Sequence, residues 1–332
     1  MSRDFQSLLP LSRQRVDRDH AARTDADRLR RLWADEASRV VVLRAGKALG
    51  APGEAPAVAL LTAGDLPDGV GDPLADDGST LYLGVALEDA GPVPAGSPLW
   101  AVFLPDAAPD ARAIDDAAEG MASADERWLD LRLTAADLDD LGAGVFTEAL
   151  AMGNWHRTHT HCPRCGAPSR AEAGGWVRRC TVQGIELFPR TDAAVIVGVV
   201  DDDDRLLLGS NAMWENNRYS LLAGFVEPGE SLEAAATREI GEESGVVIDD
   251  PEYVGSQPWP FPASLMVGFL ARVAPGGAAA ERPDGEEILD LRWFTREELA
   301  DAHHGVLFPG RSSIARAIIE RWYGGPLPEP GF

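Results

Sequence analysis

Short apolar runs alternate with turn-forming stretches through the first part of the chain. The runs lie at residues 40–43, 58–61, 81–85 and 99–104. Glycine, proline and aspartate dominate the stretches between them, such as 51–53 and 91–94. Apolar runs of this length between breakers predict β-strands joined by turns. An acidic stretch at 134–141 and a more apolar one from 146 to 154 have helical character, so residues 1–155 are predicted to form a mixed α/β domain.

A second group of strands is predicted in the last part of the chain. Residues 193–200 are apolar throughout and predict a buried strand, with 205–209 as its hairpin partner. Residues 265–273 and 289–294 add further strands. Apolar residues recur at helical spacing within 311–323, which predicts a closing helix. Together these elements predict a mixed sheet with helices on its faces.

The segment 224–246 is the stretch around which the chain is organised. It reads Gly-Phe-Val-Glu-Pro-Gly-Glu-Ser-Leu-Glu-Ala-Ala-Ala-Thr-Arg-Glu-Ile-Gly-Glu-Glu-Ser-Gly-Val. Its glycines and proline keep the first part non-helical. Ser231 is the predicted N-cap of a helix that runs to about Ser244, and Gly245 ends it.

Three glutamates of this predicted helix share one face, because Glu239, Glu242 and Glu243 are spaced i, i+3 and i+4. Carboxylates at such a short distance repel each other, and each raises the pKa of its neighbours unless a cation lies between them. Carboxylate oxygens suit Mg²⁺ or Mn²⁺, and these ions also bind phosphate oxygens. The spacing therefore indicates a metal platform for pyrophosphate chemistry. The alternative is an acidic helix face that is merely solvated.

Charge narrows the range of ligands. The 332 residues include 30 basic and 54 acidic ones, so the formal net charge is −24. Such a protein is poorly suited to track a phosphate backbone, and a nucleotide must be bound locally. The polar N-terminus lacks the apolar region of a signal peptide, and no apolar run is long enough to span a bilayer. We therefore expect a cytoplasmic protein without a membrane partner.

A cysteine-rich unit is predicted at 156–190. Its Cys-x-x-Cys spacing is typical of a zinc knuckle, and the candidate ligands are Cys162, Cys165 and Cys180. A second knuckle would place a fourth cysteine at position 183, which is Gln183. Either His159 or His161 supplies the fourth ligand, or zinc binds weakly, or the ribbon holds no metal. In the last case its shape depends on packing of Trp176, Val177, Leu187 and Phe188.

A proline-rich segment with two aromatic residues follows the acidic helix. Residues 256–264 read Ser-Gln-Pro-Trp-Pro-Phe-Pro-Ala-Ser, which is stiff and excludes a regular central strand. Trp259 and Phe261 presented on a rigid loop suit a flat ring, and stacking on an aromatic side chain contributes about 1–3 kcal/mol per base. The alternative is a loop whose aromatic residues fill the core.

Together these motifs resemble a known family. Segment 224–246 matches the Nudix box without gaps, and the Ser-Gln-Pro-Trp-Pro-Phe-Pro-x-Ser segment is similar to the signature of the NADH pyrophosphatase family. The resemblance covers about residues 145–325. It implies an α+β chain in which a Nudix α/β/α sandwich at 191–332 follows a zinc-ribbon-like unit at 156–190 and the N-terminal domain at 1–155. It also implies a homodimer.

The implied reaction is hydrolysis of the pyrophosphate bond of NADH or NAD⁺ to nicotinamide mononucleotide and AMP. Bacterial members also remove NAD caps from RNA 5′ ends. Two or three Mg²⁺ or Mn²⁺ ions would be held by Glu239, Glu242, Glu243, Glu287 and the Ala223 carbonyl. Glu242 is the first choice for the group that orients or deprotonates the attacking water, whereas Glu239 and Glu243 mainly hold metal.

The resemblance also assigns the remaining site residues. Substrate contacts are expected from Phe188, Phe225, Gln257, Pro258, Trp259, Pro260, Phe261, Pro262, Ala263, Ser264 and the backbone near Ala315. Glu230 and Arg238 are expected to form a structural pair. Phe188 stands where the family often has a tyrosine, so a phenolic hydrogen bond there is lost or replaced by stacking.

Two other functions compete with this one. One is a Nudix hydrolase for ADP-ribose or another nucleoside diphosphate derivative, which the aromatic segment disfavours. The other is a non-catalytic sensor of NAD or of RNA ends, which the intact glutamate set disfavours. The net charge favours small dinucleotides over RNA. Against this, five arginines near the knuckle could guide RNA, or they are ordinary surface charges: Arg157, Arg164, Arg170, Arg178 and Arg179.

Overall fold

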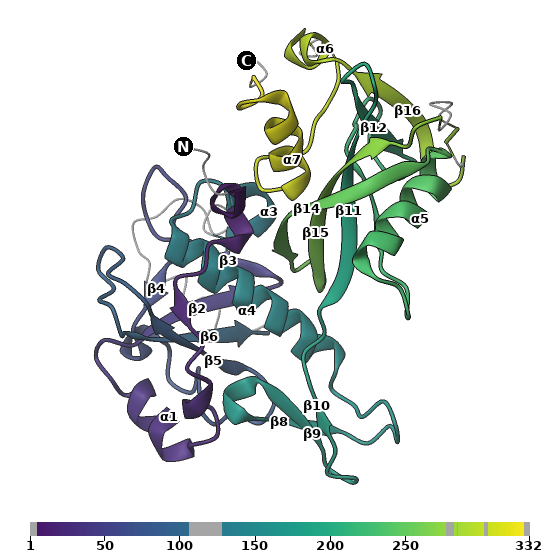
Figure 1. Cartoon of the computed structure of the whole chain (residues 1–332). Coiled ribbons are helices and arrows are strands. Elements are labelled where there is room, and N and C mark those ends of the chain that lie inside the picture. Colours follow the sequence, from purple (N-terminus) through teal and green to yellow (C-terminus); the bar gives the residue numbers. More distant parts are fainter. Residues whose placement is uncertain (1–4, 106–127, 277–281, 284, 302–304, 329–332) are drawn as a thin grey trace. The chain divides into compact units, whose positions relative to one another are not determined.

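The computed structural model describes residues 5–105, 128–276, 282–283, 285–301 and 305–328. They fall into two compact units (Figure 1). The C-terminal unit contains residues up to Ser12, then 191–259 and the chain from Ser264 onward. The N-terminal unit contains 13–190 and the four residues 260–263. Each unit therefore includes a short segment that is distant in sequence from the rest of it.

The C-terminal unit is built on a six-stranded sheet with the order β14-β15-β11-β12-β16, in which β13 also pairs with β11. The central pair β11 and β15 is parallel, and the other strand pairs are antiparallel. The strands are β11 (Asp192–Val200), β12 (Leu206–Asn211), β13 (Leu222–Phe225), β14 (Ile248–Trp259), β15 (Ser264–Val273) and β16 (Ile288–Phe294). β11, β12, β15 and β16 match the predicted runs, whereas β13 and β14 were not predicted as strands.

Successive residues of β11 point to opposite faces of this sheet. Val195, Val197 and Val199 pack in one core with Ala235, Ala236 and Ile240 of helix α5 (Leu232–Ser244). Ile196 and Val200 pack in another with Ile314 and Ile318 of helix α7 (Ile314–Tyr323). Helices therefore cover both faces (Figure 1), which confirms the predicted α/β/α sandwich. A short helix, α6 (Arg296–Asp301), follows β16.

The N-terminal unit holds a seven-stranded sheet of order β1-β5-β6-β2-β3-β7, with β4 paired to β2. The strands are β1 (Val16–Asp17), β2 (Arg39–Arg44), β3 (Lys47–Leu49), β4 (Leu60–Leu61), β5 (Thr80–Ala86), β6 (Pro98–Leu104) and β7 (Trp128–Leu129). Its helices are α1 (Ala26–Trp33), α3 (Leu131–Thr134) and α4 (Asp140–Thr158). Among the described residues, no helix is both long and apolar enough to cross a membrane.

Helix boundaries before the cysteine-rich unit differ from the predicted ones. The stretch 134–141 is not one helix, because α3 ends at Thr134 and α4 begins at Asp140. Asp139 caps α4 by accepting a hydrogen bond from the Gly142 amide at 2.6 Å. The acidic residues therefore mark a helix start, which is where short polar side chains and the helix dipole favour them. The predicted helix at 146–154 lies inside α4.

The same unit carries a three-stranded antiparallel ribbon, of order β10-β9-β8. Its strands are β8 (Ser169–Glu172), β9 (Val177–Cys180) and β10 (Glu186–Leu187). His156 of α4 is buried against this ribbon, where its Nε2 donates to the Gly175 carbonyl at 2.8 Å and Arg178 Nη1 lies 3.0 Å from Nδ1. Burial lowers the pKa of His156 to about 4, so the imidazole is neutral near pH 7.

A buried carboxylate lies on the inner face of α4. Glu148 is 4% exposed and pairs with Arg18. Burial raises the pKa of Glu148 to about 7, although the charges of Arg18 and Arg23 lower it in part. The folded chain therefore binds a proton here at a pH at which an unfolded glutamate, with its pKa near 4.3, does not.

This proton predicts the pH dependence of stability. A raised native pKa contributes stability below the unfolded pKa, and that contribution is lost as pH rises toward about 7. Relative to Glu148→Gln, the wild-type chain is expected to lose up to about 1.4 kcal/mol of unfolding free energy per pH unit in this window. Urea unfolding of both proteins at a series of pH values measures the difference. A pH-independent difference would contradict the assignment.

Candidate active site

The segment 224–246 folds as a loop followed by α5, with the predicted caps. Ser231 Oγ accepts a hydrogen bond from the Ala234 amide at 3.1 Å, and Gly245 ends the helix with φ of 71°. Gly224 lies on β13, and a Cβ atom there would come within about 2.0 Å of the Glu239 carboxyl carbon. A side chain at this position would displace the carboxylate of Glu239, which rests directly against the strand.

The box glutamates differ in exposure, and among the described residues the cysteine sulfurs, not these carboxylates, form a group close enough to hold a metal ion. Glu243 is 5% exposed, whereas the side chain of Glu242 is 62% exposed and Glu239 lies between these extremes. The pKa of Glu239 is raised, chiefly because burial disfavours its charge and further because Glu242 and Glu287 are negatively charged neighbours. Arg238 opposes this rise. The carboxylates of Glu239 and Glu242 on α5 and of Glu287 from a distant segment therefore interact electrostatically with one another.

Glu287 lies directly before β16. Residues at the end of β12 and in the turn after it contact Glu287. The backbone carbonyl of Glu287 accepts a hydrogen bond from the Ala212 amide at 2.8 Å. Asn211 Nδ2 lies 3.4 Å from Glu287 Oε1, while Asn211 Oδ1 accepts from the Met213 amide at 2.8 Å. Ala223, the predicted carbonyl ligand, lies on β13 opposite Ile196. Sequence reasoning did not identify Asn211, because its partner is 76 residues away.

Arg238 links the loop to the carboxylates. Its Nε and Nη2 donate to the two oxygens of Glu230 at 2.7 and 2.9 Å, and Nη2 also donates to the Phe225 carbonyl at 3.0 Å. Its Nη1 lies 2.9 Å from both Glu239 Oε1 and Glu242 Oε2. Arg238 holds the pKa of Glu230 down, to about 2. The guanidinium thus fixes the loop and offsets part of the negative charge.

The ligand atoms that these residues offer are of the type that binds divalent cations. Oxygen donors from several carboxylates are the ligand set that Mg²⁺ and Mn²⁺ prefer. The raised pKa of Glu239 has like-charge neighbours among its causes, so the site favours additional positive charge. Arg238 contacts three carboxylates, those of Glu230, Glu239 and Glu242, and its single positive charge cannot neutralise all three.

Several predicted substrate residues lie in the same C-terminal unit. Phe225 is exposed at the end of β13, and Ala315 is buried in the first turn of α7. Gln257 is fully buried, and its Nε2 donates to the Ser312 carbonyl at 3.0 Å just before α7. Pro258, Trp259 and Ser264 are half-buried.

Residues 256–259 form part of strand β14 rather than a loop. β14 is an edge strand, in which Pro258 pairs with Leu265 of β15. An edge strand tolerates proline, because one side of it needs no backbone donor. The prediction that excluded a central strand agrees with this arrangement, but the extent of the loop was wrong. The turn itself consists only of residues 260–263.

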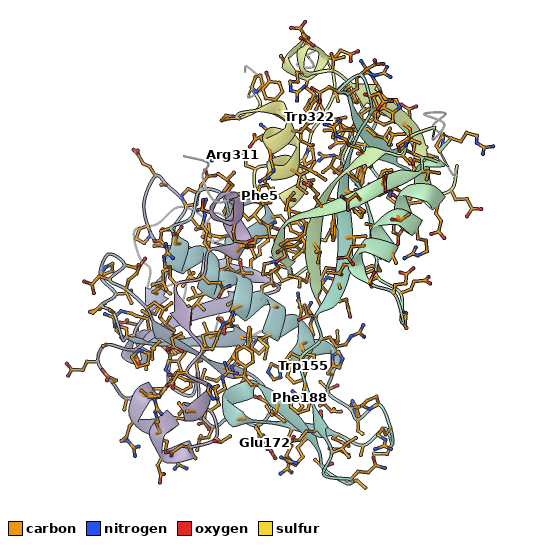
Figure 2. All side chains as sticks on the ribbon, in the orientation of Figure 1. Phe5, Trp155, Glu172, Phe188, Arg311 and Trp322 are labelled. Carbon is orange, nitrogen blue, oxygen red and sulfur yellow. The ribbon has the colours of Figure 1, made fainter. Side chains whose placement is uncertain are left out.

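The predicted substrate residues Pro260, Phe261, Pro262 and Ala263 belong to the N-terminal unit. Asn154 of α4 holds this turn, since its Nδ2 donates to the carbonyls of Pro260 and Pro262 at 2.9 and 3.1 Å. The guanidinium of Arg132 lies 4.1 Å above the Phe261 ring. Phe188 is in the same unit, just beyond β10, and is 60% exposed (Figure 2).

The N-terminal segment is a part of the C-terminal unit that the sequence did not predict. Gln6 Nε2 donates to the Ser256 carbonyl at 2.8 Å, and Ser12 Oγ donates to the same carbonyl at 2.9 Å. Phe5 and Leu9 are buried in the core that contains α7 residues such as Trp322 (Figure 2). Residues 5–12 therefore pack against both β14 and α7, the elements that carry Gln257 and Ala315.

The cysteines also come together. The Sγ atoms of Cys162, Cys165 and Cys180 lie within 4.8 Å of one another, and those of Cys165 and Cys180 are 3.5 Å apart. Three thiols are ligands that zinc prefers, so the cluster fits zinc in kind. Within the described residues, no histidine or carboxylate joins them. His159 Nδ1 lies 3.1 Å from the Trp155 carbonyl, and His161 Nδ1 lies 3.0 Å from Thr160 Oγ1.

The arginines near the knuckle are mostly paired within the chain. Arg178 is buried and donates twice to Ser169, at 2.8 Å each. Arg179 bonds Glu172 at 2.8 Å and Glu186 at 2.7 Å. Arg157 donates to Asn154 at 2.8 Å, and Arg170 lies 3.5 Å from Asp76. These contacts favour structural roles over an RNA-guiding patch.

The Arg238 network generates a prediction about stability. Arg238→Ala removes charged hydrogen bonds to Glu230 and the Phe225 carbonyl, and each such bond contributes about 1.5–3 kcal/mol in general. Because the side chain is partly solvated, we expect a loss of about 1–3 kcal/mol in denaturant unfolding. Arg292→Ala, which removes an exposed pair with Glu298, is the control and should cost at most about 1 kcal/mol. Equal losses would show that the network is not structural.

The N-terminal segment generates a second prediction. Gln6→Ala removes the donor to the Ser256 carbonyl and the 3.4 Å contact from the Ser256 amide to Gln6 Oε1. We expect hydrogen exchange in peptides covering 252–259 to increase several-fold to about tenfold, because one such bond contributes about 0.5–1.5 kcal/mol. Gln14→Ala, which removes only an acceptor for Arg18, should leave these peptides unchanged. Unaltered exchange in Gln6→Ala would show that Gln6 does not stabilise this part of β14.

The chain matches known families and proteins. Residues 189–315 match the NUDIX domain, and 157–186 match the NADH pyrophosphatase zinc ribbon domain. The NAD-capped RNA hydrolase NudC of Mycobacterium bovis is 38% identical over 317 residues, which are 89% of this chain and 94% of that protein. The protein of the same name from Stutzerimonas stutzeri is 41% identical over 206 residues, 61% of this chain and 71% of its own.

The chain also aligns with solved structures. A crystal structure of a NUDIX hydrolase from Nitrosomonas europaea aligns with a TM-score of 0.40 and 22% identity, over 51% of this chain and 95% of that one. The family rests on the sequence matches, which extend over nearly the whole chain. With a complete box, the zinc ribbon and a relative of nearly the same length, this chain belongs to the NADH pyrophosphatase family of Nudix hydrolases.

Proposed function

We propose that this chain hydrolyses the pyrophosphate bond of NADH or NAD⁺ to nicotinamide mononucleotide and AMP, and that it removes NAD caps from RNA 5′ ends. One observation carries the proposal: Glu239, Glu242 and Glu287 share one field, with the exposed Phe225 on the strand that leads into the box. The printed activity of relatives at 38–41% identity, NAD-capped RNA hydrolase, supports the substrate class.

Metal would supply the charge that this site lacks. Two or three Mg²⁺ or Mn²⁺ ions, held by Glu239, Glu242, Glu243, Glu287 and the Ala223 carbonyl, would neutralise the diphosphate and lower the pKa of the attacking water. Glu242 is proposed to take the proton from that water, because its side chain is more exposed than those of Glu239 and Glu243. Buried Glu243 and half-buried Glu239 are proposed as ligands, and Arg238 with Glu230 keeps the loop in place.

The substrate residues are proposed to act in two ways. Phe225 and Trp259 offer ring faces to the nicotinamide or the adenine, as do Phe188 and Phe261. Gln257, Pro258 and Ser264 with the backbone near Ala315 are proposed to line the binding segment. Because Gln257 is buried and bonds Ser312, it also sets the spacing between β14 and α7. Pro260, Pro262 and Ala263 are proposed to fix the turn that presents Phe261.

The wider organisation is proposed on the family resemblance. We propose a cytoplasmic homodimer in which 1–155 is the N-terminal domain, 156–190 the zinc-ribbon unit and 191–332 the catalytic domain. Zinc is proposed to bind Cys162, Cys165 and Cys180, and their clustered sulfurs support it. Free dinucleotides are proposed as the main substrates, since the net charge of −24 and the paired knuckle arginines disfavour long RNA.

The central test compares two box glutamates. Glu242→Gln removes the proposed base, so turnover of NADH with Mg²⁺ or Mn²⁺ should fall on the order of 10²- to 10⁴-fold, while the unfolding transition stays in place. Glu233→Gln is the control, because Glu233 is exposed in the first turn of the same helix. Chromatography of the products measures AMP and reduced nicotinamide mononucleotide. Unchanged turnover in Glu242→Gln would remove this residue from the mechanism.

The same assay separates the competing functions. Faster hydrolysis of ADP-ribose than of NADH would replace the proposed substrate. Absence of any metal-dependent hydrolysis by folded wild-type protein would favour the sensor. A parallel assay with an RNA that carries a 5′ NAD cap then ranks capped RNA against the free dinucleotide.

A further inference from the structure

Two turns of the zinc ribbon have the same backbone. In the first, the Cys162 amide donates to the Ala167 carbonyl at 2.7 Å, and the Gly166 amide donates to the Cys162 carbonyl at 2.9 Å. In the second, the Cys180 amide donates to the Ile185 carbonyl at 3.0 Å, and the Gly184 amide donates to the Cys180 carbonyl at 3.0 Å. Gly166 and Gly184 adopt φ of 72° and 69°.

The repeat places Gln183 where the first turn has Cys165. Each residue lies three positions after a buried cysteine and directly before a glycine with positive φ. The Gln183 amide donates to the Cys180 sulfur at 3.3 Å, so the second turn wraps its thiol as a zinc knuckle does. The backbone of a four-ligand site is therefore present, but one ligand side chain is replaced by an amide.

The neighbouring histidines do not fill the gap. Among the described residues, the sulfurs of Cys162, Cys165 and Cys180 form a group without a histidine or a carboxylate. His159 also interacts through Nδ1 with Thr158 Oγ1, at 2.9 Å. Amide oxygens are not among the usual protein ligands of zinc, whereas closed structural sites use four Cys or His side chains.

We propose that this ribbon binds one zinc ion through three thiolates and leaves the fourth coordination position to an exchangeable ligand from solution. Water occupies it at rest, and a small thiolate, a softer donor, displaces the water. Cys165 is exposed, so the cluster is accessible from solvent at this edge. The inference concerns the metal site only and does not depend on which dinucleotide is hydrolysed.

The test uses the full-length chain loaded with Co²⁺ or Zn²⁺ in a thiol-free phosphine reductant. The visible absorption of the Co²⁺ protein should show thiolate coordination and should shift when 2-mercaptoethanol is added. Gln183→Cys should abolish that shift. It should also raise zinc affinity, measured by competition with a chromophoric chelator, by at least about 10- to 100-fold, since even outer-shell changes at zinc sites have effects of that size.

Two further variants keep the proposal falsifiable. His159→Ala and His161→Ala should leave the Co²⁺ spectrum and the zinc affinity unchanged. A changed spectrum in either variant would assign the fourth position to that histidine and overturn the proposal. The proposal would also be overturned if added thiol left the wild-type Co²⁺ spectrum unchanged. A further contradicting result would be a reduced wild-type chain that binds no metal while Gln183→Cys binds one equivalent.

Discussion

Repulsion between carboxylates that must stay close is the constraint around which the C-terminal unit is arranged. Helix α5 places its glutamates on one face, and Glu287 adds a further charge from the chain before β16. Arg238 supplies compensating positive charge, because its guanidinium contacts Glu230, the Phe225 carbonyl and two box glutamates. This residue couples the shape of the loop to the charge of the site. A change in the loop conformation therefore alters the electrostatics of the glutamate site, and a change in that charge alters the loop.

Secondary structure near the box could be predicted, because its causes are local. The Ser231 cap, the αL glycine at 245 and the alternation of β11 depend on neighbours within a few residues. The spacing of Glu239, Glu242 and Glu243 likewise determines that they share a face. The same local rules placed the cysteine knuckle and anticipated that position 183 would differ from a closed site.

Contacts between distant segments could not be predicted in this way. Gln6 meets Ser256 across 250 residues, and Asn154 holds a turn 106 to 108 residues away. Nothing in the periodicity of either segment marks these partners, because a single polar side chain on an otherwise apolar segment has no pattern. Arg178 is a related case: its charge resembled a surface feature, yet tertiary packing buries it and a hydroxyl, backbone carbonyls and an imidazole receive its hydrogen bonds.

The packing of residues 5–12 within the C-terminal unit has a consequence for biosynthesis. These residues are synthesised before β14 and α7, whose residues share a core with Phe5 and Leu9. At about 5–20 residues per second, the delay before Ser256 exists is on the order of 10 to 50 s. During that interval the nascent chain carries a short apolar segment with no native partner, while residues 13–190 are synthesised. Packing of residues 5–12 therefore waits until β14 and α7 have been synthesised, so a chain that stops before them leaves Phe5 and Leu9 without their native core.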